Sequence, residues 1–326
     1  MLGFYRSRQI QEIWGIWDLA LLASCFCLQK HHHDLDQSFE FQFQVQTGSS
    51  PLSAVLILMS FTFPLEIEET ILDLLAEDDQ GHSALKTCSL VCKAFLPVCR
   101  KHIFGSIFLK DCGYPSLRQG RRVTALARLL RETPEIADYI RKLDYYRKEG
   151  FYYDYSLSIS SPPIQELESL KRISRLKFLS VRGHTISELY WNENPIRPVL
   201  LHLLHLPTLT HFKVTNTTNF VVSDLLPCVN LKYLEFARHT TVSTETTFPA
   251  ALPEHSIQLD EFIAGIDTST AIMKLCTARR PDGQPIIDFG SLSKITVVSK
   301  RLNDDEALQE LFRRCHALTS VHLSCK

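Results

Sequence analysis

The chain has 326 residues, of which 45% are hydrophobic and 22% are charged, values typical of a globular protein long enough for two domains. Its formal net charge of −1 provides neither the basic footprint of a nucleic-acid-binding protein nor an acidic tail. The ten cysteines are scattered through apolar patterns, which indicates reduced thiols inside the cell rather than a disulfide framework. We therefore expect a protein of the cytoplasm, the nucleus or both, with no nucleic acid among its partners.

Residues 1–58 differ in composition from everything that follows them. The segment 10–28 is apolar and would suit a signal peptide or a membrane anchor. Glu12 and Asp18 interrupt it, however, and a short apolar run with two acids is marginal for spanning a bilayer. We expect residues 1–58 to be an extension that is disordered or wrongly joined to the chain, and we expect no membrane partner. A true signal or anchor, and an extra ordered element, are the alternatives.

The next stretch, residues 61–108, predicts three short helices. Pro64 and Glu66 suit the first turn of a helix, where no N–H partner is needed and a carboxylate meets the positive end. The apolar stripe that follows has the spacing i, i+4, i+7 and i+8 and consists of Ile67, Ile71, Leu74 and Leu75. A second helix after Ser83 carries a similar stripe, and Pro97 turns the chain into a third. Because three such helices bury little apolar surface, we expect a partner or the following domain to complete the module.

Two motifs within these helices resemble those of a known family. The segment FPLEI at Phe63–Ile67 resembles the opening Leu-Pro-x-Glu-Ile of the F-box, with phenylalanine in place of the usual leucine. CSLVCKAF at Cys88–Phe95 resembles the second-helix core of the F-box, and RKHIFGSI at Arg100–Ile107 resembles its closing segment. The pattern is closest to the F-box proteins that mushroom-forming fungi carry in large families. The resemblance places an F-box at residues 59–110.

The F-box resemblance implies a non-catalytic adaptor. In such proteins the F-box binds the Skp-type linker of a Skp–cullin–F-box ubiquitin ligase, and the rest of the chain holds a protein substrate. By the same resemblance, the linker-binding residues would be Pro64, Leu65, Ile67, Ile71, Leu90, Val91 and Phe95. The implied partners are the Skp-type adaptor, the cullin scaffold and an unknown protein substrate. The alternative is a ligase-independent interaction scaffold that uses its F-box only to bind the linker.

Residues 111–326 repeat one apolar spacing. After a polar linker, the pattern apolar-x-x-apolar-x-apolar occurs at Ile140-Leu143-Tyr145, Leu176-Leu179-Val181, Leu209-Phe212-Val214, Leu231-Leu234-Phe236, Leu292-Ile295-Val297 and Leu318-Val321-Leu323, with a weaker copy at Leu259-Phe262-Ala264. The first apolar residue of a copy would close a turn, and the last two would alternate onto one face of a strand. Successive copies start at distances close to or above the range of leucine-rich repeats.

Helical stretches precede several copies, at residues 125–137, 198–205 and 305–314. A repeated helix–strand unit gives a parallel sheet lined by helices, because parallel neighbours need a crossover. No copy carries the asparagine that follows the strand in standard leucine-rich repeats. We therefore predict an α/β fold, in which a three-helix F-box precedes an irregular leucine-rich-repeat-like solenoid for substrate recognition. In the last copy, Val321 and Leu323 would either form an exposed apolar edge or be covered by another part of the chain.

The sequence offers weak signals for metal binding or catalysis. The pattern Cys88-x3-Cys92-x6-Cys99-x2-His102 has the residue types of a zinc site. On helices, these positions fall within a narrow arc, in which cysteine usually serves as a small buried hydrophobe. The sequence lacks the G-x-S-x-G, G-x-x-x-x-G-K-[ST] and H-E-x-x-H motifs of common enzyme classes. We therefore expect no catalytic residue, no metal and no cofactor.

The run YYRKEGFYYDY at Tyr145–Tyr155 is rich in aromatic residues interleaved with charges. Tyrosine provides a large, rigid contact area at a low entropy cost, so such a loop suits the binding of a partner. Tyr152, Tyr153 and Tyr155 are the candidate substrate-binding residues. The alternative is that these rings pack against the first repeat or cover its open end.

Overall fold

The structure is a computed structural model that describes most of the chain after residue 64. The chain divides into two compact units, Met1–Cys99 and Arg100–Lys326, which we describe separately. The described residues are 65–77, 81–91, 95–112, 121–148, 167–184, 188–243, 253–299 and 305–325. The expectations for residues 1–58 lie outside these ranges.

Three helices lie where the sequence predicts them, namely α2 (Leu65–Glu77), α3 (Gly81–Val91) and α4 (Leu96–Gly105). The first two pack against each other, with Leu72 of α2 and Leu85 of α3 almost fully buried. The predicted apolar stripe is divided, since Ile71 and Leu75 are half-buried and Ile67 and Leu74 are 45% and 46% exposed. The helix therefore leaves two of the four stripe residues, Ile67 and Leu74, at the surface of the helical unit.

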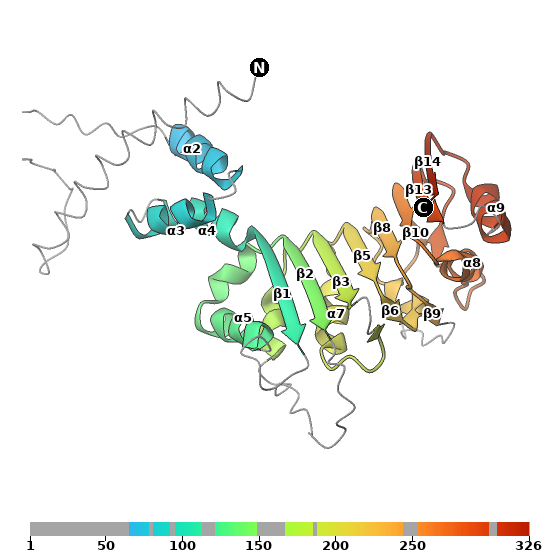
Figure 1. Ribbon diagram of the computed structural model, residues 1–326, viewed down its shortest axis with the longest axis horizontal. Coiled ribbons are helices and arrows are strands. Elements are labelled where there is room, and N and C mark those ends of the chain that lie inside the picture. Colours follow the sequence, from blue (N-terminus) through green and yellow to red (C-terminus); the bar gives the residue numbers. More distant parts are fainter. Residues whose placement is uncertain are drawn as a thin grey trace, which may run out of the picture. The chain divides into compact units, whose positions relative to one another are not determined.

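The second unit has an α/β fold with an eight-stranded parallel sheet, whose strands follow one another in chain order (Figure 1). Their bounds are β1 (Ser106–Cys112), β2 (Lys142–Lys148), β3 (Phe178–Gly183), β5 (His211–Thr215), β8 (Tyr233–Ala237), β11 (Glu261–Ala264), β13 (Lys294–Ser299) and β14 (Ser320–Cys325). The register is continuous, so that one apolar row crosses six strands through Leu143, Leu179, Phe212, Leu234, Phe262 and Ile295.

The last two apolar residues of all seven predicted copies lie on strands of this sheet, which confirms the strand prediction. From β2 to β13, the last two apolar residues of each copy are no more than 4% exposed. Full burial of such a side chain contributes about 1.5–3 kcal/mol, so these two rows form the main core of the unit. In the last copy, on β14, Val321 and Leu323 are 47% and 52% exposed, which is the first of the two alternatives for this strand.

One strand was not predicted. β1 pairs with β2 along its whole length, from Ser106 opposite Lys142 to Cys112 opposite Lys148. The sequence interpretation grouped residues up to 110 with the helical module and gave the following residues to a linker. In the structure, residues 106–112 instead form the first strand of the sheet, and Leu109 is buried in its core.

Helices cover the buried face of the sheet. The helices α5 (Arg121–Glu132), α7 (Arg197–Leu204), α8 (Ser269–Thr277) and α9 (Asp305–Arg314) contribute Leu130, Leu203, Leu275 and Leu311 to the core cluster of the strands. The predicted helical stretches 198–205 and 305–314 correspond to α7 and α9. The stretch 125–137 is broken at Pro134, where α5 gives way to the 3₁₀ helix η2 (Pro134–Asp138). Among the helices that the structure describes, none is both long and apolar enough to cross a membrane.

Smaller elements complete the connections. Two further 3₁₀ helices are η3 (Glu168–Arg172) and η4 (Val222–Leu225). Short parallel pairs join loops that follow neighbouring strands, namely β4 (Leu189–Tyr190) with β6 (Thr217–Thr218), β7 (Phe220–Val221) with β9 (Val242–Ser243), and β10 (Ile257–Gln258) with β12 (Ile287–Asp288). These pairs form three separate two-stranded sheets outside the eight-stranded sheet.

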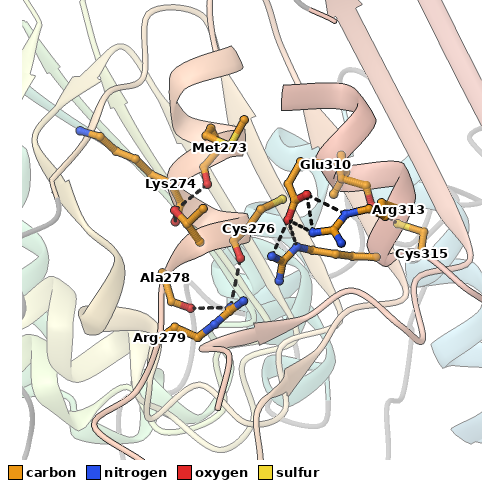
Figure 2. A network of polar contacts seen from close by, with 11 residues as sticks. Met273, Lys274, Cys276, Ala278, Arg279, Glu310, Arg313 and Cys315 are labelled. Carbon is orange, nitrogen blue, oxygen red and sulfur yellow. Dashed lines mark hydrogen bonds and ion pairs between the residues drawn. The ribbon is translucent and has the colours of Figure 1, made fainter. Parts of the chain in front are cut away.

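The last two helices are joined by both packing and charge. α8 packs against α9, and Figure 2 shows Glu310 of α9 close to Cys276 of α8. The Glu310 carboxylate accepts hydrogen bonds from Arg313 at 2.7–3.0 Å and from Arg314 Nε at 2.6 Å. These bonds lower the pKa of Glu310. The group is at the protein surface, so it orients the end of α9 more than it stabilises the fold.

Candidate interaction surface

The eight-stranded sheet has a second face, formed by the strand residues that alternate with the core residues. We call it the open face. Its first row across the sheet is Ser106, Lys142, Phe178, His211, Tyr233, Glu261, Lys294 and Ser320. Its second row is Phe108, Asp144, Ser180, Lys213, Glu235, Ile263, Thr296 and His322. Its third row starts with Lys110, Tyr146, Arg182, Thr215 and Ala237.

Part of the first row forms a ladder that consists of Lys142 and three rings. The Lys142 ammonium lies 4.8 Å from the centre of the Phe178 ring. The centroids of the Phe178 and His211 rings are 6.2 Å apart, and those of the stacked His211 and Tyr233 rings are 5.3 Å apart. Such contacts hold flat side chains upright on a half-exposed surface. The row therefore offers a fixed, partly apolar contact area.

The second row carries most of the ion pairs of the open face. Asp144 lies 3.7 Å from Lys142 on its own strand and 3.7 Å from Arg182 on the next. Lys213 pairs with Glu235 at 2.7 Å, and the Tyr233 hydroxyl donates to the same carboxylate at 2.8 Å. Burial and the hydrogen bond to Glu235 raise the pKa of Tyr233. The phenol therefore stays protonated and acts as a donor.

A cluster of rings and a guanidinium occupies the β1 end of the open face. The Phe108 and Tyr146 rings stack with centroids 6.3 Å apart and an interplanar angle of 22°. The Arg182 guanidinium lies 5.7 Å from the centre of the Phe108 ring. Phe108 is 47% exposed, which is unusual for a phenylalanine on a strand. An exposed ring next to a charged donor is typical of protein-binding surfaces.

Two polar atoms near this cluster lack a hydrogen-bond partner among the described residues. They are Ser180 Oγ and Arg182 Nε, and both are buried from solvent. Ser180 is fully buried at the floor of the second row, between Asp144 and Lys213. Because buried polar groups are nearly always hydrogen-bonded, this floor is a place where a bound group or a water molecule would find partners.

The F-box-like residues are only partly described by the structure. Ile67 is 45% exposed and Leu90 is 84% exposed, while Ile71 and Phe95 are half-buried. Leu65 begins α2 and Val91 ends α3, but their side chains, like all of Pro64, lie outside the described residues. Ile67 and Leu90 are thus the apolar members of the predicted set that the helical unit leaves at its surface.

The aromatic run is divided by the sheet. Tyr145 is fully buried, and its hydroxyl donates to Asp111 at 2.9 Å, whereas Tyr146 lies on the open face. The packing interpretation therefore holds for Tyr145. The candidate residues Tyr152, Tyr153 and Tyr155 lie outside the described residues and stay predictions. Sequence reasoning missed Phe108 and Arg182, although alternation along a strand was a signal that could have placed them opposite the core.

The zinc-like cysteines are buried thiols where the structure describes them. Cys99 is fully buried, and its burial, together with the nearby Cys88, raises its pKa to about 11. Burial also raises the pKa of Cys88. Since a metal ligand must be a thiolate, this environment favours the role of small hydrophobes. Within the described ranges, no three metal-ligating side chains are grouped; Cys92 lies outside them.

Comparisons with known proteins leave the family open. No protein-family model matches the chain. A search of curated proteins finds no similar sequence.

Proposed function

We propose that this chain is a substrate-recognition adaptor of a Skp–cullin–F-box type ubiquitin ligase. The observation that carries the proposal is the exposure of Ile67 and Leu90, two apolar residues of the F-box-like motifs, on a helical unit whose described part buries Leu72, Leu85 and Cys99. Exposed apolar residues on neighbouring helices are typical of a surface that a partner covers. A Skp-type linker is the partner that the motif resemblance implies.

The second unit would hold the substrate. The succession of helices and parallel strands supports the interpretation of residues 111–326 as an irregular leucine-rich-repeat-like solenoid. Its open face carries the rings of Phe108, Tyr146 and Tyr233 and the guanidinium of Arg182, which are side chains of the kinds enriched at protein interfaces. The chain would perform no chemistry itself. It would raise the local concentration of a substrate lysine near the ubiquitin-conjugating enzyme, in the cytoplasm, the nucleus or both.

Affinity purification of the tagged full chain from cells, with and without a proteasome inhibitor, tests this proposal. We expect the Skp-type linker and the cullin to co-purify in both conditions, and a substrate protein to accumulate only with the inhibitor. Co-purification of the linker without the cullin would support the ligase-independent scaffold instead. Absence of the linker from every preparation would contradict both functions.

A further inference from the structure

The β1 end of the open face carries more positive charge than it neutralises. Its cations are Lys110, Lys142 and Arg182, and Asp144 is the one acid in the three rows on β1, β2 and β3. We call the set Phe108, Lys110, Lys142, Asp144, Tyr146 and Arg182 the β1–β3 patch. Lys110 forms no ion pair with any residue that the structure describes.

Asp144 does not saturate the neighbouring cations. Its carboxylate oxygens lie 3.7 Å from Lys142 Nζ and from Arg182, beyond the roughly 2.7–2.9 Å of a charge-assisted hydrogen bond. Among the described residues, none hydrogen-bonds to the Arg182 guanidinium, and its buried Nε has no partner. A guanidinium presents its donors as a planar fork that matches a carboxylate in a bidentate manner. Apart from Asp144, no carboxylate of the described residues pairs with Arg182, so the guanidinium is placed to receive a second carboxylate from a partner.

The ring beside Arg182 adds an apolar requirement. Phe108 is 47% exposed and is held by Tyr146 on one side and by the Arg182 guanidinium at 5.7 Å. These contacts fix the orientation of the ring before any partner arrives, which reduces the entropy cost of binding. The free part of the ring can stack on another aromatic side chain.

We propose that the β1–β3 patch binds a protein segment that places a carboxylate on Arg182 and an aromatic side chain on Phe108. Because guanidinium and ring are 5.7 Å apart and consecutive Cα atoms are about 3.8 Å apart, the acid and the aromatic residue would be about one or two positions apart in the segment. Lys142 and Lys110 would attract further acids around this pair. The inference rests on the proposed function only for the identity of the bound protein as a ubiquitination substrate.

Cations beside rings also suit single-stranded nucleic acid, but the charges favour a peptide. A nucleic acid presents a phosphate at every step, so its path across the sheet would meet Asp144 and then Glu235 and Glu261 in the same rows. The chain has a formal net charge of −1 and thus no general attraction for a polyanion. A peptide, in contrast, need not carry a charge at every position, so its acidic residues can be limited to the positions that meet the cations.

Fluorescence anisotropy with the purified full chain tests the inference. The probes are short labelled peptides with a Gly-Ser background and a central Phe-Glu, Phe-Gln, Ala-Glu or Phe-Lys pair. We expect the Phe-Glu peptide to bind most tightly, and Phe-Gln or Ala-Glu to bind about tenfold more weakly. Binding of the Phe-Glu peptide should also weaken as salt rises from low to physiological concentration.

Variants assign the binding to the patch. Arg182→Gln should weaken the Phe-Glu peptide about tenfold, and Arg182→Lys, which keeps the charge but loses the fork, should lie between this variant and the wild type. Lys294→Gln is the matched control for Lys142→Gln, since both lysines stand in the first row of the open face. We expect Lys142→Gln to weaken binding and Lys294→Gln to leave it unchanged. Each variant is first checked by its melting temperature.

Three outcomes would overturn the inference: a preference for Phe-Gln or Phe-Lys over Phe-Glu, equal losses from Lys142→Gln and Lys294→Gln, or displacement of the peptide by poly(U) RNA that binds more tightly. If Arg182→Gln does not fold, the other two variants replace it. The inference is then overturned if both Arg182→Lys and Lys142→Gln bind the Phe-Glu peptide as tightly as the wild type does. The assay contains no linker, so its outcome is independent of the adaptor function. Peptide binding without co-purification of the linker would contradict only the adaptor function. Co-purification of the linker without peptide binding would contradict only the proposed binding by the β1–β3 patch.

Discussion

The backbone of Asn216 lies so close to Gly183 that a Cβ atom on the glycine would be 2.1 Å from the Asn216 carbonyl oxygen. The same oxygen accepts a hydrogen bond from Leu189 N at 2.9 Å. The Asn216 side-chain amide donates to Gly183 O at 3.4 Å, and the residue is buried with a φ of 50°. The loops that leave β3 and β5 are thus tied together through their backbones, with glycine at the contact.

Replacement of Gly183 by alanine should therefore destabilise the sheet unit. The added methyl group meets backbone atoms, which cannot rotate away as a side chain can, so we expect a loss of about 2–3 kcal/mol in the free energy of unfolding. Gly105→Ala is the matched control, because a Cβ atom there has nothing within 4 Å. Urea unfolding measures both variants. Equal stability of the two variants would show that the loops are not in the described contact.

A buried carboxylate joins three parts of the core. Asp224 is 9% exposed and accepts hydrogen bonds from Trp191 Nε1 at 2.7 Å and from Arg197 at 2.8 Å. Asp224→Ala would leave the indole N–H and the guanidinium without this partner, which we expect to cost about 3–5 kcal/mol. Asp260→Ala removes an exposed acid 3.7 Å from Lys232 and should cost less than about 1 kcal/mol. Similar losses for the two variants, measured by chemical denaturation, would refute the buried network.

The last strand permits a direct test of burial. Leu323 and Val297 are register partners on β14 and β13, but Leu323 is 52% exposed and Val297 only 4%. Leu323→Ala removes more carbon than Val297→Ala, yet we expect it to cost less than about 1 kcal/mol, against about 2 kcal/mol for Val297→Ala. Melting curves of both variants check the order. A larger loss for Leu323→Ala would mean that another part of the chain covers β14.

The thiol of Cys276 should make stability depend on alkaline pH. Burial raises its pKa from 9.0 to about 12, so the unfolded state releases this proton at a lower pH than the folded state does. The stability from this group is therefore complete below pH 9.0 and is lost as pH rises toward about 12, by about 1.4 kcal/mol per pH unit. The Cys276→Ala variant lacks this term, so its free energy of unfolding should fall less steeply above pH 9.0. Parallel pH profiles for variant and wild type would contradict the assignment.

The strands were predictable because their apolar spacing reflects the core directly. Each copy places two side chains on the buried face, and this requirement is visible in the sequence. β1 escaped because Phe104, Ile107 and Leu109 share the spacing but directly follow a helix, with which the F-box resemblance grouped them. The loops that follow β8 and β11 carry no asparagine, whereas the loop after β5 carries the buried Asn216. Thr240 and Thr268 instead hydrogen-bond to the carbonyls of Ala237 and Gly265 at 2.8 and 2.7 Å.

The open face was not predictable in the same way. Its residues leave no periodic pattern, because half-exposed positions accept polar, charged and aromatic side chains equally. Phe108, Asp144 and Arg182 come together only through the register of three strands that are distant in sequence. Tyr145 and Tyr146 show the point at close range, since neighbours in one aromatic run lie on opposite faces of β2. Where a strand starts decides which of the two is available to a partner.

Co-precipitation with the purified Skp-type linker tests the adaptor function most directly. The variant pair is Ile67→Asp with Leu90→Asp, compared with Leu74→Asp, whose side chain is about as exposed as that of Ile67 but stands outside the motif. Burying an unpaired charge costs several kcal/mol, more than a small apolar interface can offset. We predict that the wild type and Leu74→Asp retain the linker and that the double variant loses it while keeping its melting temperature. Retention of the linker by the double variant, or no binding by the wild type, would contradict the account.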